Sequence, residues 1–101
     1  MTEHQLQISC IAFFRNNITR KRLGIIIPVP NELARKRKDV PVCLGCSDTI
    51  LVFKGRIVFC EFKVGKNNQQ DNQIEFQFFV EELGYEYHVI KTIQDFENLL
   101  R

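Results

Sequence analysis

The stretch that decides the fold is residues 45–63, with the sequence GCSDTILVFKGRIVFCEFK. Two apolar segments of strand length, 48–53 and 56–64, are separated by the dipeptide Lys54-Gly55. Apolar segments on either side of a two-residue turn are typical of a β-hairpin. Both segments carry apolar side chains on alternate positions of both faces, which indicates a sheet that is covered on both sides. The stretch therefore predicts a hairpin inside an α/β fold.

A tight turn at this dipeptide fixes which residues of the two strands lie opposite each other. It pairs Phe53 with Arg56, and the same register places Asp48 directly opposite Glu61. Opposed side chains share one face with Cβ atoms about 4.5–5.5 Å apart, and Lys63 faces the same way because it lies two residues after Glu61. Two neighbouring carboxylates repel each other unless a positive charge neutralises them. We therefore expect a bound cation; an ion pair with Lys63 at the strand ends is the structural alternative.

Composition indicates an ordinary globular protein. The 101 residues suit a single domain covering 1–101, and 45% of them are hydrophobic and 26% charged. The sequence has no run close to the ~20 apolar residues of a membrane span, and its N-terminus has no signal-peptide pattern. We therefore expect no membrane contact and a cytoplasmic location in a bacterium or a phage-infected host, or a nuclear one in a eukaryote.

Positive charge is concentrated in the first part of the chain. Residues 1–38 contain eight Lys and Arg against two Glu, a net charge of +6, and the remaining residues have a net charge of −4. This asymmetry suits a protein that contacts phosphate while carboxylates hold a metal, although a solvated cationic face explains each basic run equally well. The candidate DNA contacts are Arg20, Lys21, Arg22, Asn31, Arg35, Lys36, Arg37, Lys38 and Lys66.

The four cysteines allow a zinc interpretation that the spacing supports poorly. Cys43 and Cys46 have the spacing of a zinc knuckle, but a zinc site needs two further ligands. Cys10 and Cys60 stand alone in apolar segments, so reduced and mostly buried thiols are the main expectation. A zinc-stabilised interaction domain remains an alternative.

The rest of the sequence predicts helices and strands on either side of the hairpin. Thr2 and Gln5 form the pattern of a helix capping box, and Gly84 is placed to end a helix. Glu3 lies in the first turn, where spacing alone indicates a surface acid that the helix dipole favours. The expected elements are helices at 2–16, 69–83 and 92–100, strands at 23–29 and 85–90, and a basic loop or short helix at 33–38.

These residues also carry a family resemblance. Asp48 followed by Glu61-Phe62-Lys63 is an instance of D-(x)n-E-x-K, the pattern of the PD-(D/E)XK nucleases. Over nearly the whole chain the sequence resembles the VRR-NUC (virus-type replication-repair nuclease) family, as a minimal stand-alone member. Two features depart from the pattern: the segment 31–45 is short, and Cys46-Ser47 replaces a hydrophobic–Pro pair. The other matching elements, in order, are Pro30-Asn31-Glu32, Gly45-Cys46-Ser47-Asp48, Gln73-Ile74-Glu75-Phe76 and Leu83-Gly84.

The resemblance implies a restriction-endonuclease-like mixed β-sheet flanked by helices and a metal-dependent hydrolysis of phosphodiester bonds. The oxygen ligands suit Mg²⁺ or Mn²⁺. Asp48 and Glu61 would bind the ion, with the carbonyl of Phe62 completing the coordination, and Lys63 would orient the attacking water. By position in the family pattern, Glu3 approaches the metal and Gln73 lies beside the site, with the nearby Gln7, Gln69 and Gln70 as alternatives.

The resemblance further implies a substrate and an oligomeric state. Small members of the family resemble Holliday-junction resolvases, so we expect a structure-specific endonuclease that cuts branched or four-way DNA as a homodimer. The alternative within this fold is a non-catalytic module that binds nucleic acid.

Overall fold

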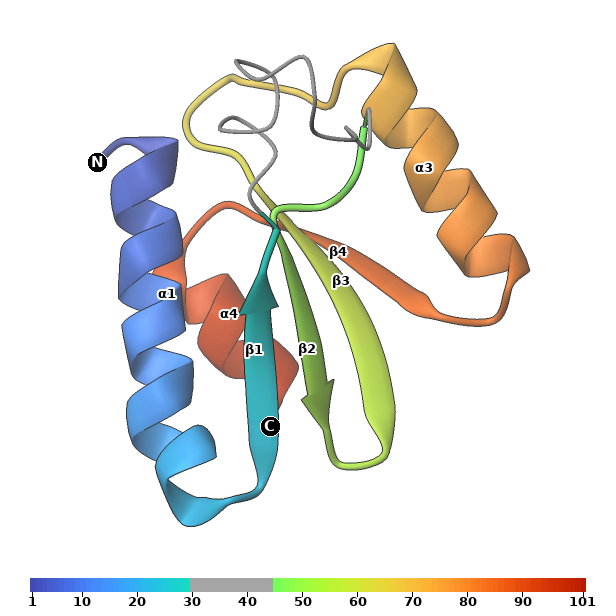
Figure 1. Ribbon diagram of the computed structural model, residues 1–101. Helices are drawn as coiled ribbons and strands as arrows, with labels where there is room; N and C mark the ends of the chain where they lie inside the picture. The colour runs from blue at the N-terminus through green and yellow to red at the C-terminus, as the bar shows by residue number, and fades with distance from the viewer. Residues whose placement is uncertain (30–44) are drawn as a thin grey trace, which may run out of the picture.

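The computed structural model describes residues 1–29 and 45–101, and over these residues the chain is an α/β fold. Three α-helices pack around a four-stranded mixed sheet in the described ranges (Figure 1). The elements are α1 (Glu3–Asn17), a short 3₁₀ helix η1 (Thr19–Lys21), β1 (Gly24–Pro28), β2 (Thr49–Phe53), β3 (Arg56–Phe62), α3 (Asp71–Glu82), β4 (Glu86–Ile90) and α4 (Ile93–Leu100).

The central hairpin has the predicted register. Lys54 and Gly55 both have positive φ, 50° and 69°, as a type I′ turn requires. Phe53 pairs with Arg56, and the ladder continues without a bulge to Thr49 and Cys60. The next residues along the two strands are the carboxylates Asp48 and Glu61, so both acids lie at the same end of the hairpin.

The strand order in the sheet is β1-β2-β3-β4. β1 pairs antiparallel with β2, β2 pairs antiparallel with β3, and β3 pairs parallel with β4. Helix α3 forms the crossover between the two parallel strands (Figure 1). The expected mixed sheet flanked by helices is therefore confirmed for the described residues.

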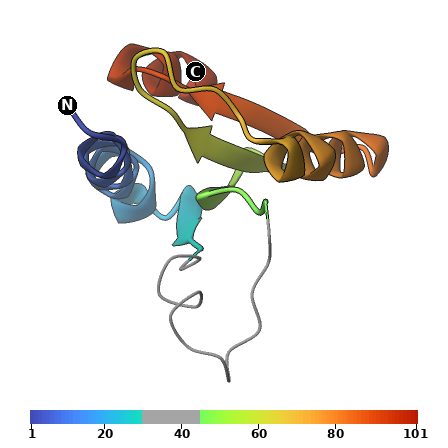
Figure 2. The same cartoon turned by 90° about the horizontal axis from the view of Figure 1, so that it is seen from above.

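One face of the sheet is covered by α1 and α4. Figure 2 shows α4 on the side of the sheet opposite α3. The ring of Phe14 in α1 lies edge-on to Phe53 of β2 at 5.9 Å and 6.5 Å from Phe96 of α4. Phe14 and Phe96 are completely buried, and each such side chain stabilises the fold by about 1.5–3 kcal/mol. The other members of this core are Leu6, Cys10, Ile26, Leu51, Val58, Cys60, Phe62, Ile90 and Leu100.

The opposite face is covered only in part. Phe76 of α3 packs on Phe59 of β3 at 5.9 Å and on Tyr87 of β4 at 6.2 Å. The apolar side chains toward β1 remain exposed, with Ile25 at 51% and Val52 at 37%. Among residues 1–29 and 45–101, the expectation of a sheet covered on both sides therefore fails over β1 and β2, because α3 packs against the β3 and β4 side.

Pro28 does not interrupt the pairing of the first strand. A proline commonly disturbs pairing at the end of a strand, yet Pro28 pairs with Thr49 and the Val29 N–H donates to the Asp48 carbonyl at 2.9 Å. The proline is tolerated because β1 is an edge of the described sheet, where a missing N–H on the open side costs nothing. The loop or short helix predicted at 33–38 lies outside the described residues.

The remaining boundaries differ from the predictions by one or two residues. The helix predicted at 69–83 begins at Asp71, after the N-cap Gln70, and ends before Gly84, whose φ is 89°. Thr2 and Thr92 both form capping boxes at the starts of α1 and α4. In the described ranges, none of these helices has the length and apolar character needed to cross a membrane.

Candidate active site

The site is built on the ends of β2 and β3. The backbone N–H of Phe62 donates to Asp48 Oδ2 at 2.8 Å, which fixes the Asp48 carboxylate beside the end of β3. In an extended strand the N–H and C=O of one residue point to the same side, so the carbonyl of Phe62 faces the side of Asp48. The hairpin register thus assembles two carboxylates and one carbonyl at one end of the sheet.

Glu61 is the most deeply buried acid of this group. It is 3% exposed, and its Oε1 accepts a hydrogen bond from Gln73 Nε2 at 2.8 Å. The orientation of the Gln73 amide is set from the other side, because its Oε1 accepts the backbone N–H of Gln70 at 2.9 Å. The second oxygen of Glu61, Oε2, is buried without a hydrogen-bond partner among the described residues.

Burial and mutual repulsion make the two acids difficult to ionise together. Burial, followed by the charge of Asp48, raises the pKa of Glu61 to about 8. Burial also raises the pKa of Asp48, against the lowering effects of the Phe62 N–H and of Lys63. Without a cation the pair therefore holds a proton near neutral pH, and a metal ion would take the place of that proton.

Lys63 lies inside the site. The residue is 8% exposed, and its Nζ is 3.9 Å from Glu61 Oε1 and 4.0 Å from Glu3 Oε1. These distances exceed a direct hydrogen bond, so the ammonium group supplies charge to both acids without closing a tight pair with either. The structural alternative, an ion pair with Lys63 at the strand ends, is therefore present as a long pair with Glu61 and a second one with Glu3.

Helix α1 brings Glu3 to the same place. Thr2 caps the helix by accepting the Gln5 N–H at 3.1 Å, so the first turn, with Glu3, starts next to the end of β3. Asn67, in the loop after β3, donates to Glu3 Oε2 at 2.7 Å. Spacing alone left Glu3 as a surface acid; the structure places it 4.0 Å from Lys63.

Gly45 explains how the segment before Asp48 reaches the site. Its φ is 79°, and a Cβ atom at this position would lie 2.2 Å from the backbone oxygen of Asn72. Only glycine allows the chain to pass this close to the first turn of α3, which carries Gln73. The role was not predicted from the sequence, where the glycine was only part of a matching motif.

A second polar layer supports α3 next to Glu61. Gln69 Nε2 donates to Gln77 Oε1 at 3.0 Å and to the Tyr87 hydroxyl at 3.3 Å. Tyr87 is 6% exposed, and burial, with the nearby charge of Glu61, raises its pKa. Sequence reasoning did not predict this layer beyond the position of Tyr87 on a strand.

The donor set fits a hard divalent cation. Within residues 1–29 and 45–101, no three His, Cys, Asp or Glu side chains surround a common point. Asp48 and Glu61 still offer carboxylate oxygens, one of which is buried and unsatisfied, and Phe62 offers a carbonyl. Mg²⁺ is commonly held by one or two carboxylates together with water, so these residues could bind Mg²⁺ or Mn²⁺.

The candidate DNA contacts fall into two regions. Lys66 follows the site directly, in the loop between β3 and α3. Arg20, Lys21 and Arg22 lie past the C-terminal end of the 15-residue α1, about 22 Å along that helix from Glu3. The structure therefore does not bring them to the carboxylates. Asn31, Arg35, Lys36, Arg37 and Lys38 lie outside the described residues.

The cysteines take no part in this site. Cys10 and Cys60 are free and completely buried, and burial raises the pKa of each thiol to about 12. Cys46 is disulfide-bonded, so the expectation of reduced thiols is wrong for this residue. Cys43 lies outside the described residues, and the zinc interpretation stays without support.

Comparison with protein-family models, with curated proteins and with solved structures gave no match to this chain.

Proposed function

We propose that this chain is a Mg²⁺- or Mn²⁺-dependent nuclease that hydrolyses phosphodiester bonds in DNA. The observation that carries the proposal is the buried carboxylate of Glu61. One of its oxygens has no partner among the described residues, Asp48 lies beside it, and Lys63 Nζ is 3.9 Å away. Burying two acids and an ammonium group side by side is costly, and the binding of a cation at an anionic substrate gives a reason for that cost.

The topology supports the more specific assignment to a restriction-endonuclease-like fold of the VRR-NUC type. An antiparallel hairpin carries the acids, and a crossover helix then leads to a parallel strand. The D-(x)n-E-x-K pattern lies at the end of that hairpin, with Gln73 on the crossover helix at hydrogen-bond distance from Glu61. This arrangement is the one that the family resemblance implied for these positions.

Each residue has a role that its geometry suits. Asp48, Glu61 and the Phe62 carbonyl would hold the ion, while Gln73 keeps Glu61 in position. When bound, the metal would polarise the scissile phosphate and lower the pKa of a coordinated water. Lys63 would donate a hydrogen bond to the attacking water or to the phosphate oxygen on which charge develops.

The proposed substrate is branched DNA, such as a four-way junction, which a homodimer would cut with two sites. Lys66, in the loop that follows β3, would contact a phosphate near the site. Glu3 would approach the metal from α1, held by Asn67.

The proposal is tested by incubating the purified protein with four-way, flap and linear duplex DNA, with Mn²⁺ or with a chelator. We expect Mn²⁺-dependent cleavage that prefers branched DNA and is lost in Asp48→Asn. The matched control is Glu75→Gln, which neutralises an exposed acid on α3 and should leave cleavage unchanged. DNA binding without cleavage under all metal conditions would instead assign a non-catalytic binding module.

A further inference from the structure

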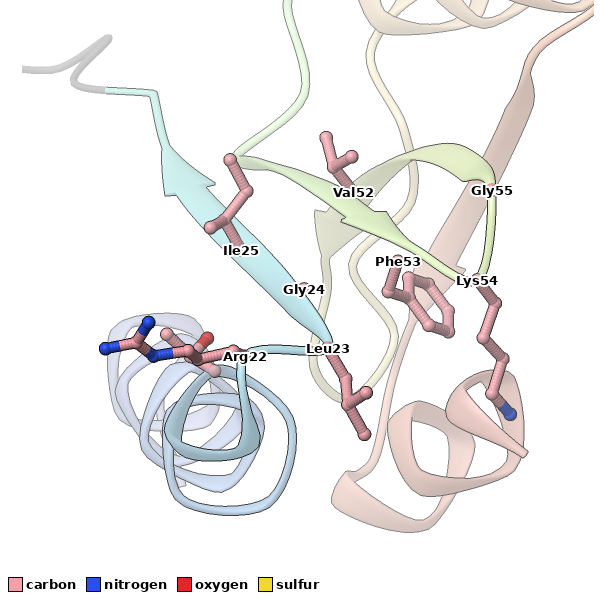
Figure 3. A pocket seen from close by; sticks show the side chains of 9 residues that line it. Arg22, Leu23, Gly24, Ile25, Val52, Phe53, Lys54 and Gly55 are labelled. Atoms are coloured by element: carbon pink, nitrogen blue, oxygen red, sulfur yellow. The ribbon is translucent and has the colours of Figure 1, made fainter.

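The sheet face on the α3 side has an uncovered apolar area over β1 and β2. Ile25, Val52 and Ile57 lie opposite one another in a row across three strands and are 51%, 37% and 39% exposed. A hollow of about 540 Å³ lies at the end of the sheet that carries the turn between β2 and β3, with Ile25 and Val52 in its lining. Figure 3 shows the charged ends of Arg22 and Lys54 pointing away from it on opposite sides, so the surface between them is apolar.

Helix α3 carries the second exposed apolar surface. Ile74 and Phe78, one turn apart, are 51% and 65% exposed, and Phe79 and Leu83 are 62% and 61% exposed. α3 lies on the same side of the sheet as the uncovered row, because its Phe76 packs on Phe59, two residues after Ile57. An exposed phenylalanine at the outermost position of a helix is unusual unless another surface covers it.

The charges next to these two surfaces are opposite. Glu81 and Glu82 follow Phe78 toward the C-terminal end of α3, and residues 67–90 contain no Lys or Arg. Arg20, Lys21 and Arg22 precede β1, and these three residues form no ion pair in the part of the chain that the structure describes.

The two charged groups lie at the same end of the sheet. β1 and β3 run in the same direction, because both are antiparallel to β2. β4 is parallel to β3, so β1 and β4 also run in the same direction. η1 directly precedes β1 and α3 directly precedes β4, so both lie where these strands begin. They stand at opposite edges of the sheet, β1 being first and β4 last in the strand order.

We infer that a second copy of this chain covers the open face, with α3 of each copy packed over β1 and β2 of the other. The two copies would be related by a twofold axis parallel to the strands. This rotation places α3, which lies at the β4 edge of its own sheet, over the β1 edge of the partner's sheet. It does not reverse the strand direction, so the strand starts of both copies lie at the same end of the dimer. Phe78 then meets the row of Ile25, Val52 and Ile57. The acidic end of α3 meets the basic turn before β1.

Size and charge both favour a second copy as the occupant. A helix is about 10 Å wide and neighbouring strands are about 4.8 Å apart, so one helix covers the two open strands. The exposed parts of the apolar side chains on the open face and α3 amount to roughly 800 Å², close to what each partner contributes to a standard interface. Nucleic acid would be repelled by the acidic α3, whereas this chain itself carries both complementary surfaces.

The proposed interface does not depend on the proposed nuclease activity. It does determine where the two carboxylate sites would lie in the dimer. An axis parallel to the strands leaves the two carboxylate sites at the same end of the dimer, away from the basic turns. The dimer would therefore present both sites to one DNA molecule from one side. In this arrangement Arg20, Lys21 and Arg22 contact protein instead of DNA.

The first test is the mass of the full chain in solution, measured by light scattering and by sedimentation over a range of concentrations. We expect a dimer, and the substitutions Val52→Lys and Phe78→Lys should each weaken dimerisation at least about tenfold, because a lysine cannot be buried at the centre of an apolar interface. Ile8→Lys is the matched control, since Ile8 on α1 is 53% exposed and lies outside both surfaces. This control should remain dimeric.

The second test exchanges the charges. A chain with Glu81→Lys and Glu82→Lys should be monomeric, and so should a chain with Arg20→Glu, Lys21→Glu and Arg22→Glu. Mixing the two variants should restore a heterodimer, because each α3 then meets a complementary turn in the partner. Far-ultraviolet circular dichroism shows whether each variant is folded.

Three results would overturn the inference. One is a folded wild-type chain that stays monomeric at all concentrations, which would point to a different occupant of the open face. Another is a dimer that tolerates both lysine substitutions. The third is a pair of folded charge variants that remain monomeric after mixing, or an Arg20–Arg22 variant that keeps its dimer and loses only DNA binding.

Discussion

The environment of the Glu61 carboxylate is the main evidence for the proposed function. A buried acid normally satisfies both oxygens, and leaving one unsatisfied costs about 1–3 kcal/mol or more. Glu61 satisfies one oxygen with Gln73 and leaves the other unpaired among the described residues, next to Asp48. Its raised pKa is the direct result of that environment, so its protonation and the binding of a cation must be linked.

The metal-free protein should lose stability as the pH rises. The pKa of Glu61 in the folded chain, about 8, is above its usual value of 4.5. Its stabilising contribution is complete below pH 4.5 and is lost as the pH rises toward 8, by about 2–4 kcal/mol. Urea unfolding with a chelator at pH 5 and pH 8.5 should show this loss, and Glu61→Gln should abolish it. A Glu75→Gln protein with the same loss as wild type is the expected control; equal pH profiles for Glu61→Gln and wild type would contradict the account.

Metal binding should release a proton. Near pH 7 Glu61 is mostly protonated, because its pKa is about 8, and a metal ligand must be deprotonated. Titration calorimetry with Mn²⁺ in buffers of different ionisation enthalpy should show release approaching one proton per ion at pH 7 and little release at pH 9. Proton release that is the same at both pH values would show that Glu61 is not the linked group.

At the scale of the elements, the hairpin could be predicted because its register is local. Lys54 and Gly55 set the turn, and the turn alone determines that Asp48 and Glu61 lie opposite each other. Contacts between segments far apart in the sequence could not be predicted in this way. Gly45 against Asn72 and Asn67 against Glu3 both depend on how loops pass next to helices after folding.

Replacing Gly45 should damage the site as well as the fold. Gly45→Ala puts a Cβ 2.2 Å from the Asn72 backbone at a φ of 79°, so the first turn of α3 must move and take Gln73 with it. We expect a loss of about 2–4 kcal/mol in stability and at least about tenfold weaker Mn²⁺ binding. Gly84→Ala is the control: its φ is 89° but no atom lies within 4 Å, so it should cost only about 1 kcal/mol and leave Mn²⁺ affinity unchanged.

The cap of α1 should matter for Glu3. Thr2→Ala removes the side chain that accepts the Gln5 N–H, at a cost of about 1 kcal/mol, and frays the turn that carries Glu3. Hydrogen exchange should speed up in this turn, and Mn²⁺ affinity should fall. Thr92→Ala removes the same type of cap from α4, away from the site, and should leave Mn²⁺ affinity unchanged. Equal affinities in the two variants would remove Glu3 from the site.

At the scale of the whole molecule, the two faces of the sheet differ in how far the described helices cover them. The sequence shows apolar residues on both faces, and that pattern does not say which face is covered by the same chain. α1 and α4 bury one face, and α3 leaves Ile25, Val52 and Ile57 exposed on the other. An intermolecular contact would satisfy the apolar pattern as well as an intramolecular one, so the pattern alone does not determine which chain supplies the second layer.

The molecule also separates its charges. The carboxylates, Lys63 and Lys66 lie at one end of the sheet, and Arg20–Arg22 lie at the other. The charge asymmetry along the sequence does not show how far apart its basic residues lie: Arg20–Arg22 follow α1, about 22 Å along that helix from Glu3. The proposed nuclease centre uses only residues at the end of the sheet that carries the carboxylates.

The most direct test of that centre is the Mn²⁺-dependent cleavage of a four-way DNA junction by wild type and by Lys63→Ala, with binding measured in parallel. Lys91→Ala, which removes an exposed lysine at the end of β4, is the matched control. We predict cleavage by wild type and the control, and a rate at least about a hundredfold lower for Lys63→Ala with its DNA affinity retained. Undiminished cleavage by Lys63→Ala, or no cleavage by the wild-type chain, would contradict the assignment of Asp48, Glu61 and Lys63 as a nuclease centre.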